Sequence, residues 1–418
     1  MDMGHELVLL AQKIDWHSIE TDLSVYYSRT GQPAVPIRLI SGCLILKHLY
    51  NYGDETLAKA WVMNPHMQYF CGEAHFCHRF PFDPSDFVHF RHRIGEEGVN
   101  TPFRHSIEIH GKAASEAVVL SATTVQGNNT TYPTDARLYK KIIDRCGSIA
   151  QRHNLPVRQN YKRVSKQLLR QAYNSKHPKR KKQAFKARRK LHTIAGRMVR
   201  ELERILPDLE RMLYSKDLEI FNRVLSQTRN DKNKIYSLHK PYTDCIAKGK
   251  AHKPYEFGNK VGFLITSKSL IITAVRTFTG NPHDGRTIAP LVEELKRNKL
   301  PLPDEIVYDR AAKGITLDEE IKVSVPSNPL KNDTPYQKQK KRKKFRRRAA
   351  IEPVNAHLKF DFRMQENYLS GERYVQLNAL LSAMAWNLKK WMQKAISWLY
   401  EKYISYLFIF QQQLQFMK

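Results

Sequence analysis

The sequence lacks an uninterrupted apolar run of the roughly 18 to 20 residues that a membrane helix needs. The longest candidate, 396–410, is broken by Glu401 and Lys402. The N-terminal segment MDMGHELVLLAQKIDWHS carries acids early and has no basic stretch followed by an apolar one, which argues against a secretory signal. Five cysteines in 418 residues are an odd and sparse set. A disulfide scaffold is therefore not expected, and a reducing cytoplasm is the predicted compartment.

Signatures of several other chemistries are also missing. No segment rich in Gly and Lys has the spacing of a phosphate-binding loop, so we expect no nucleotide cofactor. Cys71, His75, Cys77 and His78 cluster, but their spacing differs from that of structural zinc sites, and ordinary packing or surface exposure is the favoured interpretation. None of the 17 histidines pairs convincingly with a Ser or Cys nucleophile.

Positive charge is what the sequence has in excess, with 70 Lys plus Arg against 40 Asp plus Glu and a net charge of +30. A hydrophobic fraction of 41% excludes a wholly disordered chain. The charge therefore indicates a polyanionic partner, most simply nucleic acid. Residues 1–116 contain 10 basic and 14 acidic residues, so the rest of the chain carries the whole excess.

Two internal runs supply much of the excess. Residues 176–190 hold 9 basic residues in 15, and residues 338–348 hold 9 in 11. Such runs usually form solvated faces or disordered tails, but both lie inside periodic apolar sequence, which excludes tails. We expect both runs to contact phosphates, with release of counterions.

The periodicity predicts helices through the first hundred residues, including one opening at Pro36, one after a break and N-cap at Gly53-Asp54, and one ending at Gly95. AVVLSATTVQ, starting at Ala117, predicts a buried strand. A long basic helical block follows over 137–215. Strands are then expected at 234–239, 260–267, 270–278 and 305–309 and in KVSVPS, and the strands 260–267 and 270–278 are expected to form a hairpin across Lys268-Ser269. Helices are expected in RTIAPLVEELKRNK, around 351–359 and from Asn378 onward. This order favours an α/β domain carrying a helical insertion.

Asp309 and Glu352 are the candidate catalytic acids. Asp309 ends a short apolar strand, where α/β folds place ligands, although such an Asp also commonly caps a turn. Glu352 lies on a predicted helix with Arg348 four residues before it and Lys359 seven after it, all on one face. A single Glu flanked by basic residues usually forms a surface ion pair that contributes little to stability.

Together these residues resemble a known signature. Phe345, Arg348, Glu352 and Lys359 are spaced as in the Tyr-two-Arg-three-Glu-six-Lys signature of bacterial insertion-sequence transposases. The segments TTVQGNNTTYPTDARLYKKIID, GKAHKPYEFGNKV, GNPHDGRTIAPL, DTPYQKQKKRKKFRRRAAIEPV and HLKFDFRMQENYLSGE are similar to insertion-sequence family five. The resemblance spans roughly 35–392.

The resemblance implies a ribonuclease-H-like catalytic core that uses an Asp, Asp, Glu triad. Two Mg²⁺ (or Mn²⁺) ions held by such a triad activate a water and stabilise the leaving oxygen. Carboxylates suit these hard cations. Asp309 and Glu352 are the metal ligands implied here, and Arg348 and Lys359 would neutralise phosphates beside them.

The sequence departs from the family at the first acidic position, which is occupied by Ala122. A methyl group cannot coordinate a metal. Asp135 lies in the family's own Tyr-Pro-Thr-Asp stretch and is not expected to take over. Gly127 stands where an acid is common, and Asn355-Ala356 where a bulkier apolar residue and Gly are common; both changes are milder.

The expected organisation is a helical N-terminal domain (1–113) for DNA-end binding or dimerisation, a first strand region of the core (114–136), a basic helical insertion (137–215), the remainder of the core (216–392) and a C-terminal helical tail (393–418). The cations expected to contact DNA are Arg348, Lys359, Lys340, Lys341, Arg342, Lys343, Lys344, Arg346, Arg347, Lys179, Arg180, Lys181 and Lys182.

The resemblance implies a DNA transposase that binds terminal inverted repeats and target DNA, cleaves and joins strands, and acts as a homodimer or larger assembly, because two ends must be paired. It implies a bacterial cytoplasmic protein, associated with the nucleoid when bound and not with a membrane. Ala122 predicts impaired cleavage. The alternative is an inactive DNA-binding relative that occupies or represses transposon ends; a generic RNA-binding protein fits less well, because no RNA-binding module is present.

Overall fold

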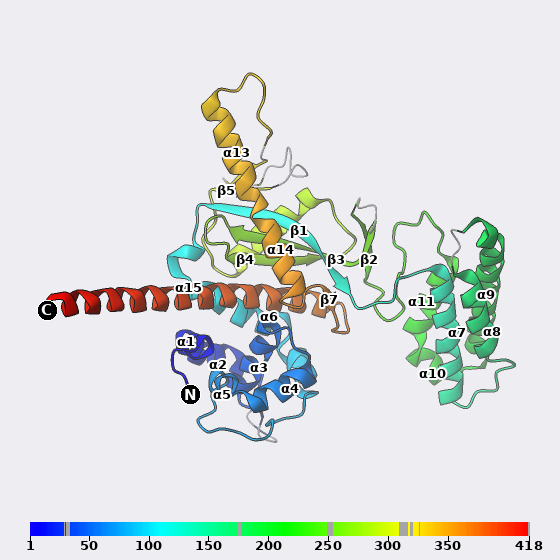
Figure 1. The fold of residues 1–418 in the computed structure, drawn as a ribbon. Helices are drawn as coiled ribbons and strands as arrows, with labels where there is room; N and C mark the ends of the chain where they lie inside the picture. Colours follow the sequence, from blue (N-terminus) through cyan, green and yellow to red (C-terminus); the bar gives the residue numbers. More distant parts are fainter. Residues whose placement is uncertain are drawn as a thin grey trace.

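The computed structural model describes residues 1–28, 30, 34–173, 177–248, 254–308, 317, 321–325 and 327–416, with side chains up to residue 402 (Figure 1). The chain forms a mixed α/β structure in which a seven-stranded sheet is flanked by helices and a separate helical bundle. Asp309 and Arg310 lie outside the described residues, so the expected end of the strand at Asp309 has no structural account.

The N-terminal region is helical, as predicted. Its helices are α1 (Glu6–Lys13), α2 (Trp16–Ser24), α3 (Ile37–Leu49), α4 (Asp54–Met63), α5 (Pro65–Phe70) and α6 (Asp86–Glu108).

Two details of these helices bear on the predictions. The backbone of α6 leaves helical geometry at Gly95, where φ is 58°, which agrees with the predicted helix end. The predicted cap at Gly53-Asp54 is confirmed at Gly53, which occupies the N-cap position of α4, whereas Asp54 is the first residue of the helix. The Asp54 carboxylate instead pairs with Lys47 and Arg91, because two buried cations need a counter-charge.

The sheet is built around β1 (Val118–Asn128). On one side, β1 pairs antiparallel with β3 (Tyr255–Thr266). On the other, it pairs in parallel with β5 (Glu305–Val307), which pairs in parallel with β6 (Lys322–Ser324). The far edge of β3 pairs with β2 (Asp244–Ala247) near its start and with β4 (Ile272–Phe278) farther along.

The C-terminal end of β1 is tightly enclosed. The short β7 (Glu366–Asn367) pairs with β1 at Gly127 and Asn128. A Cβ atom at Gly127 would lie 2.5 Å from the carbonyl oxygen of Gln365, so the strands can approach this closely only because no side chain is present.

The predicted hairpin is confirmed, since β3 and β4 pair antiparallel across the turn 267–271. The strand predicted at 234–239 is wrong. Ile235 is buried there, but its backbone N–H donates to the side-chain oxygen of Gln227, and the Gln227 amide donates back to its carbonyl. A side-chain amide thus replaces the neighbouring strand that would otherwise satisfy this backbone.

Two hydrophobic clusters cover the faces of the sheet. On one face, β1, β3 and β5 pack with η2 (Asp284–Thr287) and α12 (Ile288–Arg297). On the other, α14 (Ile351–Phe360) and the long α15 (Arg373–Phe416) pack against the sheet and against the N-terminal helices. Figure 1 shows α15 passing between the sheet and these helices and running on to the C-terminus. The short η1 (Gly111–Ala114) leads into β1.

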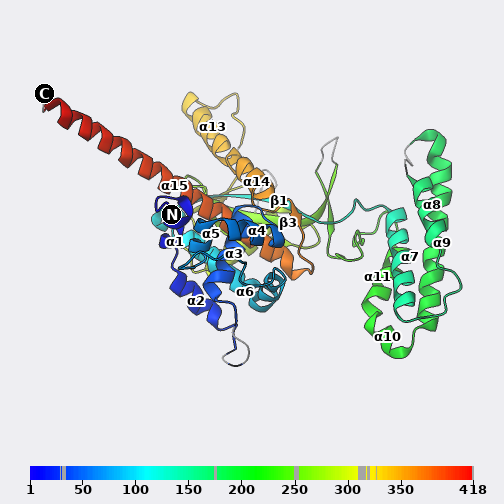
Figure 2. The same cartoon turned by 60° about the horizontal axis from the view of Figure 1, so that its bottom comes forward.

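The insertion forms a bundle with its own hydrophobic cluster. Its helices are α7 (Asp135–Arg152), α8 (Lys162–Ala172), α9 (Pro178–Ile205), α10 (Asp208–Leu213) and α11 (Ser215–Ser226). Both views show the bundle standing to one side of the sheet (Figures 1 and 2). The remaining helix, α13 (Pro335–Ala349), comes directly before α14 in the chain and projects away from the sheet (Figure 1). Among the described residues, no helix combines the length and apolar character required to cross a bilayer.

Candidate active site

Ala122 lies in the middle of β1, opposite Phe263 of β3. It is 6% exposed and belongs to the same hydrophobic cluster as Val354 and Leu358 of α14. The helix that carries Glu352 therefore packs over the strand that carries Ala122. Both elements are predicted by the local sequence pattern, and tertiary packing brings them together.

Glu352 lies in the first turn of α14 with its side chain 69% exposed. The Nη1 atom of Arg348, in the last turn of α13, lies 3.7 Å from the Glu352 Oε1 atom on α14. The two side chains are therefore close, as the four-residue spacing predicted, although a helix boundary at Ala350 separates them. Exposure of this carboxylate leaves it accessible to a ligand approaching α14.

Lys359, in the last turn of α14, lies beside an acid that the sequence analysis did not single out. Its Nζ atom is 3.6 Å from the Oε2 atom of Glu256 on β3, and both side chains are about four-fifths buried. Because α14 crosses the sheet here, this pair links the helix to the edge of β3.

The implied two-metal site can be tested only in part on the described residues. Ala122 offers no ligand atom, Glu352 supplies a single carboxylate, and Asp309 lies outside the described part of the chain. Among the described residues, no group of three or more His, Cys, Asp or Glu side chains could hold a metal ion. The described residues therefore do not by themselves fit a two-ion site.

The basic run 338–348 forms α13, whose N-terminus is closed by a capping box between Thr334 and Gln337. None of its side chains is buried. Three of its cations form ion pairs within the described part of the protein: Lys341 with Asp333 at 2.7 Å, Lys344 with Glu305 at the start of β5, and Arg348 with Glu352. The exposed cations of the run are Lys340, Arg342, Lys343 and Arg346, whereas Arg347 and Arg348 are half-buried.

The other basic run lies mainly on α9. Lys179, Arg180, Lys181 and Lys182 are exposed in its first turns, while Ala184 and Ala187 turn into the bundle. The first residue of the run, Lys176, is outside the described residues. The amphipathic pattern of α9 thus presents a cationic face to solvent and an apolar face to α7, α8 and α11.

A further polar cluster beside β1 joins Asp284, which lies in a segment with the composition of a turn, to two residues of predicted strands. Thr123 donates a hydrogen bond of 3.0 Å to Asp284, and the buried Lys260 lies 2.6 Å from the same carboxylate. Thr123 follows Ala122 in the strand, so its side chain points to the opposite face of the sheet. Asp284 is therefore not placed to replace a carboxylate at Ala122.

The molecule thus combines a mixed sheet, a helix with an exposed acid packed over the central strand, and two solvent-facing basic helices. Comparison with known proteins agrees with this arrangement. Residues 1–93 match the family model described as "Transposase domain (DUF772)", and residues 224–388 match that described as "Transposase DDE domain".

Over 165 residues the chain is 36% identical to the "Uncharacterized protein ORF8 in nfe locus" of Rhizobium meliloti, an alignment that covers 38% of this chain and 80% of the relative. No solved structure matches the chain significantly. The chain belongs to the DDE transposases, and its two transposase domains indicate an insertion-sequence transposase.

Proposed function

We propose that the protein binds the terminal inverted repeats of an insertion sequence of family five and that Ala122 impairs its strand cleavage and transfer. The sheet supports a ribonuclease-H-like core: a long β1 pairs antiparallel with β3 and in parallel with β5. The observation that carries the proposal is the methyl group of Ala122 on the central strand, beneath the helix that bears Glu352.

In an intact site of this kind, two divalent ions would supply an activated water and stabilisation of the leaving oxygen. Asp309 and Glu352 are the proposed ligands from this chain. Arg348 is proposed to meet a phosphate beside Glu352, where a guanidinium can form paired hydrogen bonds to two phosphate oxygens. Lys359, farther along α14, is proposed to contact phosphates of the same DNA backbone.

The exposed cations of α9 and α13 are proposed to contact the DNA backbone. They lie on two separate parts of the molecule, which suits a long duplex that passes both the bundle and the sheet (Figure 1). Such contacts bind without reading sequence and depend strongly on salt.

The second candidate function is that of an inactive relative that occupies transposon ends or represses intact copies. The same observation at Ala122 favours it, because DNA contacts on α9 and α13 do not need the metal ligand. The two functions differ only in catalysis.

A strand-transfer assay with the inverted repeats that flank the coding region, in Mg²⁺ or Mn²⁺, tests the proposal. We expect little product from the chain as it stands and a gain from Ala122→Asp larger than the roughly 10- to 100-fold effect typical of outer-shell changes at metal sites. Ala122→Asn is the matched control, because it has nearly the same shape without the charge, and it should not restore activity.

Equal and robust activity in the unmodified chain and in Ala122→Asp would contradict the impairment. Tight end binding with no product from either protein would favour the repressor function. Failure of the unmodified chain to bind the repeats would contradict both.

A further inference from the structure

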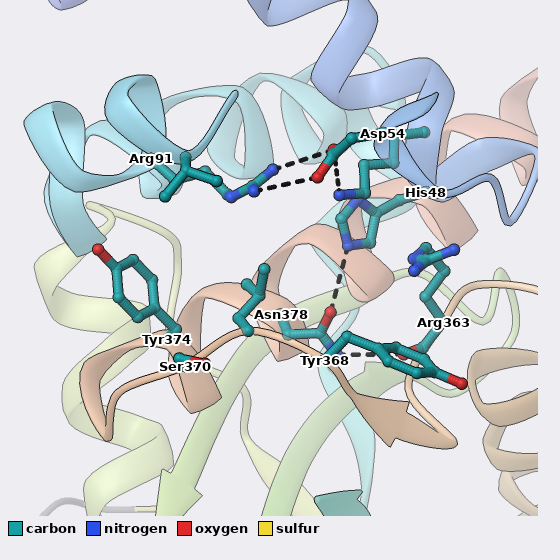
Figure 3. Close-up of a pocket in the computed structure, with 12 residues that line it drawn as sticks. His48, Asp54, Arg91, Arg363, Tyr368, Ser370, Tyr374 and Asn378 are labelled. Atoms are coloured by element: carbon teal, nitrogen blue, oxygen red, sulfur yellow. Dashed lines mark hydrogen bonds and ion pairs between the residues drawn. The ribbon is translucent and has the colours of Figure 1, made fainter. Parts of the chain in front are cut away.

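A cavity of about 570 Å³ opens between the N-terminal helices and the segment that joins α14 to α15 (Figure 3). Its walls come from α3, α4 and α6 on one side and from residues 363–378 on the other. Drug-sized ligands typically occupy cavities of roughly 300 to 1,000 Å³. The volume therefore exceeds what a phosphate ion alone requires, while a double helix could not enter.

Cations dominate the charge of this cavity. Lys47 and Arg91 have side chains only 5% and 3% exposed, and both pair with Asp54. Burial and the nearby positive charge of Arg91 lower the pKa of Lys47 to about 8. His48 is fully enclosed, and burial holds its pKa well below the usual value, so it adds no charge at neutral pH.

Arg363 adds a third cation on the opposite wall. Its guanidinium donates to the carbonyl oxygen of Asn51 at 3.2 Å, and the Asn51 amide donates back to the carbonyl of Phe360 at 2.9 Å. Both residues have left-handed backbones, with φ of 65° at Arg363 and 56° at Asn51. Such conformations disfavour most side chains and persist where the surrounding contacts enforce them. These contacts hold Arg363 at the mouth of the cavity.

Three cations against the single carboxylate of Asp54 leave the cavity with an unbalanced positive charge. Crowding like charges at low exposure is unfavourable unless an anion is supplied. Phosphate is suited to this role, because guanidinium and ammonium groups form charge-assisted hydrogen bonds with its oxygens.

Aromatic rings supply the remaining recognition chemistry. Tyr368 is 58% exposed, and its ring lies 5.7 Å from the Arg363 guanidinium carbon. Tyr374 lines the same wall, and Figure 3 shows both rings beside the open space. Cations combined with tyrosine rings are the features that bind a nucleotide, phosphate on one and base on the other.

We propose that this cavity binds one nucleotide of the transposon-end DNA, displaced from the duplex, with its phosphate against Arg363 and its base against Tyr368. The inference rests on the proposed DNA-end binding and adds a site for a single unstacked nucleotide. Extruded bases are bound elsewhere in such closed pockets, by stacking and by polar contacts.

The cavity is also connected to β1. Asn378 accepts a hydrogen bond from the ring of His48 at 3.4 Å and donates to the side chain of Gln126 at 2.9 Å. Gln126 lies four residues after Ala122 on the same strand face. The wall of the cavity is therefore linked, through Asn378 and Gln126, to the strand that carries Ala122.

The first test is calorimetry on the full chain with deoxyadenosine 5′-monophosphate, deoxyadenosine and inorganic phosphate as separate probes. We expect the monophosphate to bind at least about tenfold more tightly than either part alone, because charged hydrogen bonds and base stacking each contribute. Arg363→Gln and Tyr368→Leu should each weaken its binding about tenfold. Arg79→Gln, which removes an exposed charge outside the cavity, should leave it unchanged.

The second test places 2-aminopurine at successive positions of an inverted-repeat duplex and measures fluorescence on binding. Unstacking at one position should raise the signal with the unmodified chain and with Arg79→Gln, and the rise should be lost in Arg363→Gln and Tyr368→Leu. Thermal unfolding of each variant shows whether it is folded; the Lys47–Asp54–Arg91 group is left intact because its removal would destabilise the fold.

Equal affinity for inorganic phosphate and for the monophosphate would overturn the nucleotide site. So would end-DNA binding by the unmodified chain without monophosphate binding and without a fluorescence rise at any position. If the unmodified chain does not bind the end DNA at all, the proposed function fails, and this inference fails with it.

Discussion

The helices α9 and α13 both carry a dense run of Lys and Arg, but they differ in how they pack against the rest of the protein. α9 buries a continuous apolar side, including Ala187, Leu191 and Ile194, in the cluster of the helical bundle. α13 buries no side chain: Lys344 pairs with Glu305 at the start of β5, and Lys341 pairs with Asp333 in the loop just before the helix. A run of positive charge therefore does not by itself indicate how a helix is anchored.

The difference separates two roles for the charge. The cations of α9 sit on a bundle with its own core, away from β1, so their contribution is expected to be affinity for the DNA backbone. Those of α13 lead directly into Arg348 and Glu352, so they are expected to align DNA at the catalytic face. Three experiments test whether α9 and α13 differ in this way.

The largest effect is expected from the apolar anchoring of α9. Leu191 is fully buried, so Leu191→Ala should lower the free energy of unfolding by about 2 to 5 kcal/mol, through the loss of burial and the cavity left behind. Phe185→Ala, on the exposed side of the same helix, and Phe345→Ala on α13 should each cost much less. Denaturant unfolding measures all three, and a comparable loss at Phe345 would show that α13 is also anchored by apolar packing.

The second-largest effect is expected from removing the exposed positive charges of α9 or of α13. Changing Lys179, Arg180, Lys181 and Lys182 together to Gln should weaken end binding and reduce the slope of its salt dependence by up to about 0.9 for each phosphate that is no longer neutralised. Changing Lys340, Arg342, Lys343 and Arg346 to Gln should additionally reduce strand transfer in an Ala122→Asp background. Affinity measured across a salt series and product yield at saturating protein separate these effects. Identical product yields at saturation would refute the separate roles.

The smallest effect is expected from the ion pair between Lys344 and Glu305. Burial raises the pKa of the Glu305 carboxyl, but hydrogen bonds from Lys344 and Ser324 outweigh it and leave that pKa below its ordinary value. A carboxyl whose pKa is lower in the folded state stabilises the protein at neutral pH and loses that contribution as pH falls below about 4.5.

Lys344→Met should therefore reduce stability by about 0.2 to 1 kcal/mol at pH 7, and by less under acid conditions. Urea unfolding at pH 7 and near pH 4 measures the difference, with Lys343→Met, an exposed neighbour, as the control. A loss that does not diminish with acid would show that packing of the Lys344 stem, rather than its charge, anchors α13.

Much of the fold near the candidate site was predictable from local pattern. The β-branched run around Ala122 predicted β1, and the alternation on both sides of 267–271 predicted the β3–β4 hairpin. The four-residue spacing of Arg348 and Glu352 predicted their proximity, because helical geometry alone places such residues on one face.

Three other features of the structure could not be predicted from the local sequence pattern. The segment 234–239 has the composition of a strand, but the side chain of Gln227 takes up the backbone groups of Ile235. From its position in the sequence, Asp54 was expected at a helix cap. In the folded protein its carboxylate pairs with Arg91, which is 37 positions away in the sequence. Lys359 was expected beside Glu352, and its pairing with Glu256 depends on how α14 crosses β3.

The sequence by itself determined the helices, the central strands, the two basic runs and the absence of an acid at Ala122, since each depends on neighbours in the chain. Tertiary structure decided which cations are neutralised and which face solvent. It also assembled the cavity of Lys47, Arg91, Arg363 and Tyr368 from segments that lie 272 to 321 residues apart in the sequence. Burial and charge pairing act through space between distant residues, whereas local propensity does not extend beyond a few positions.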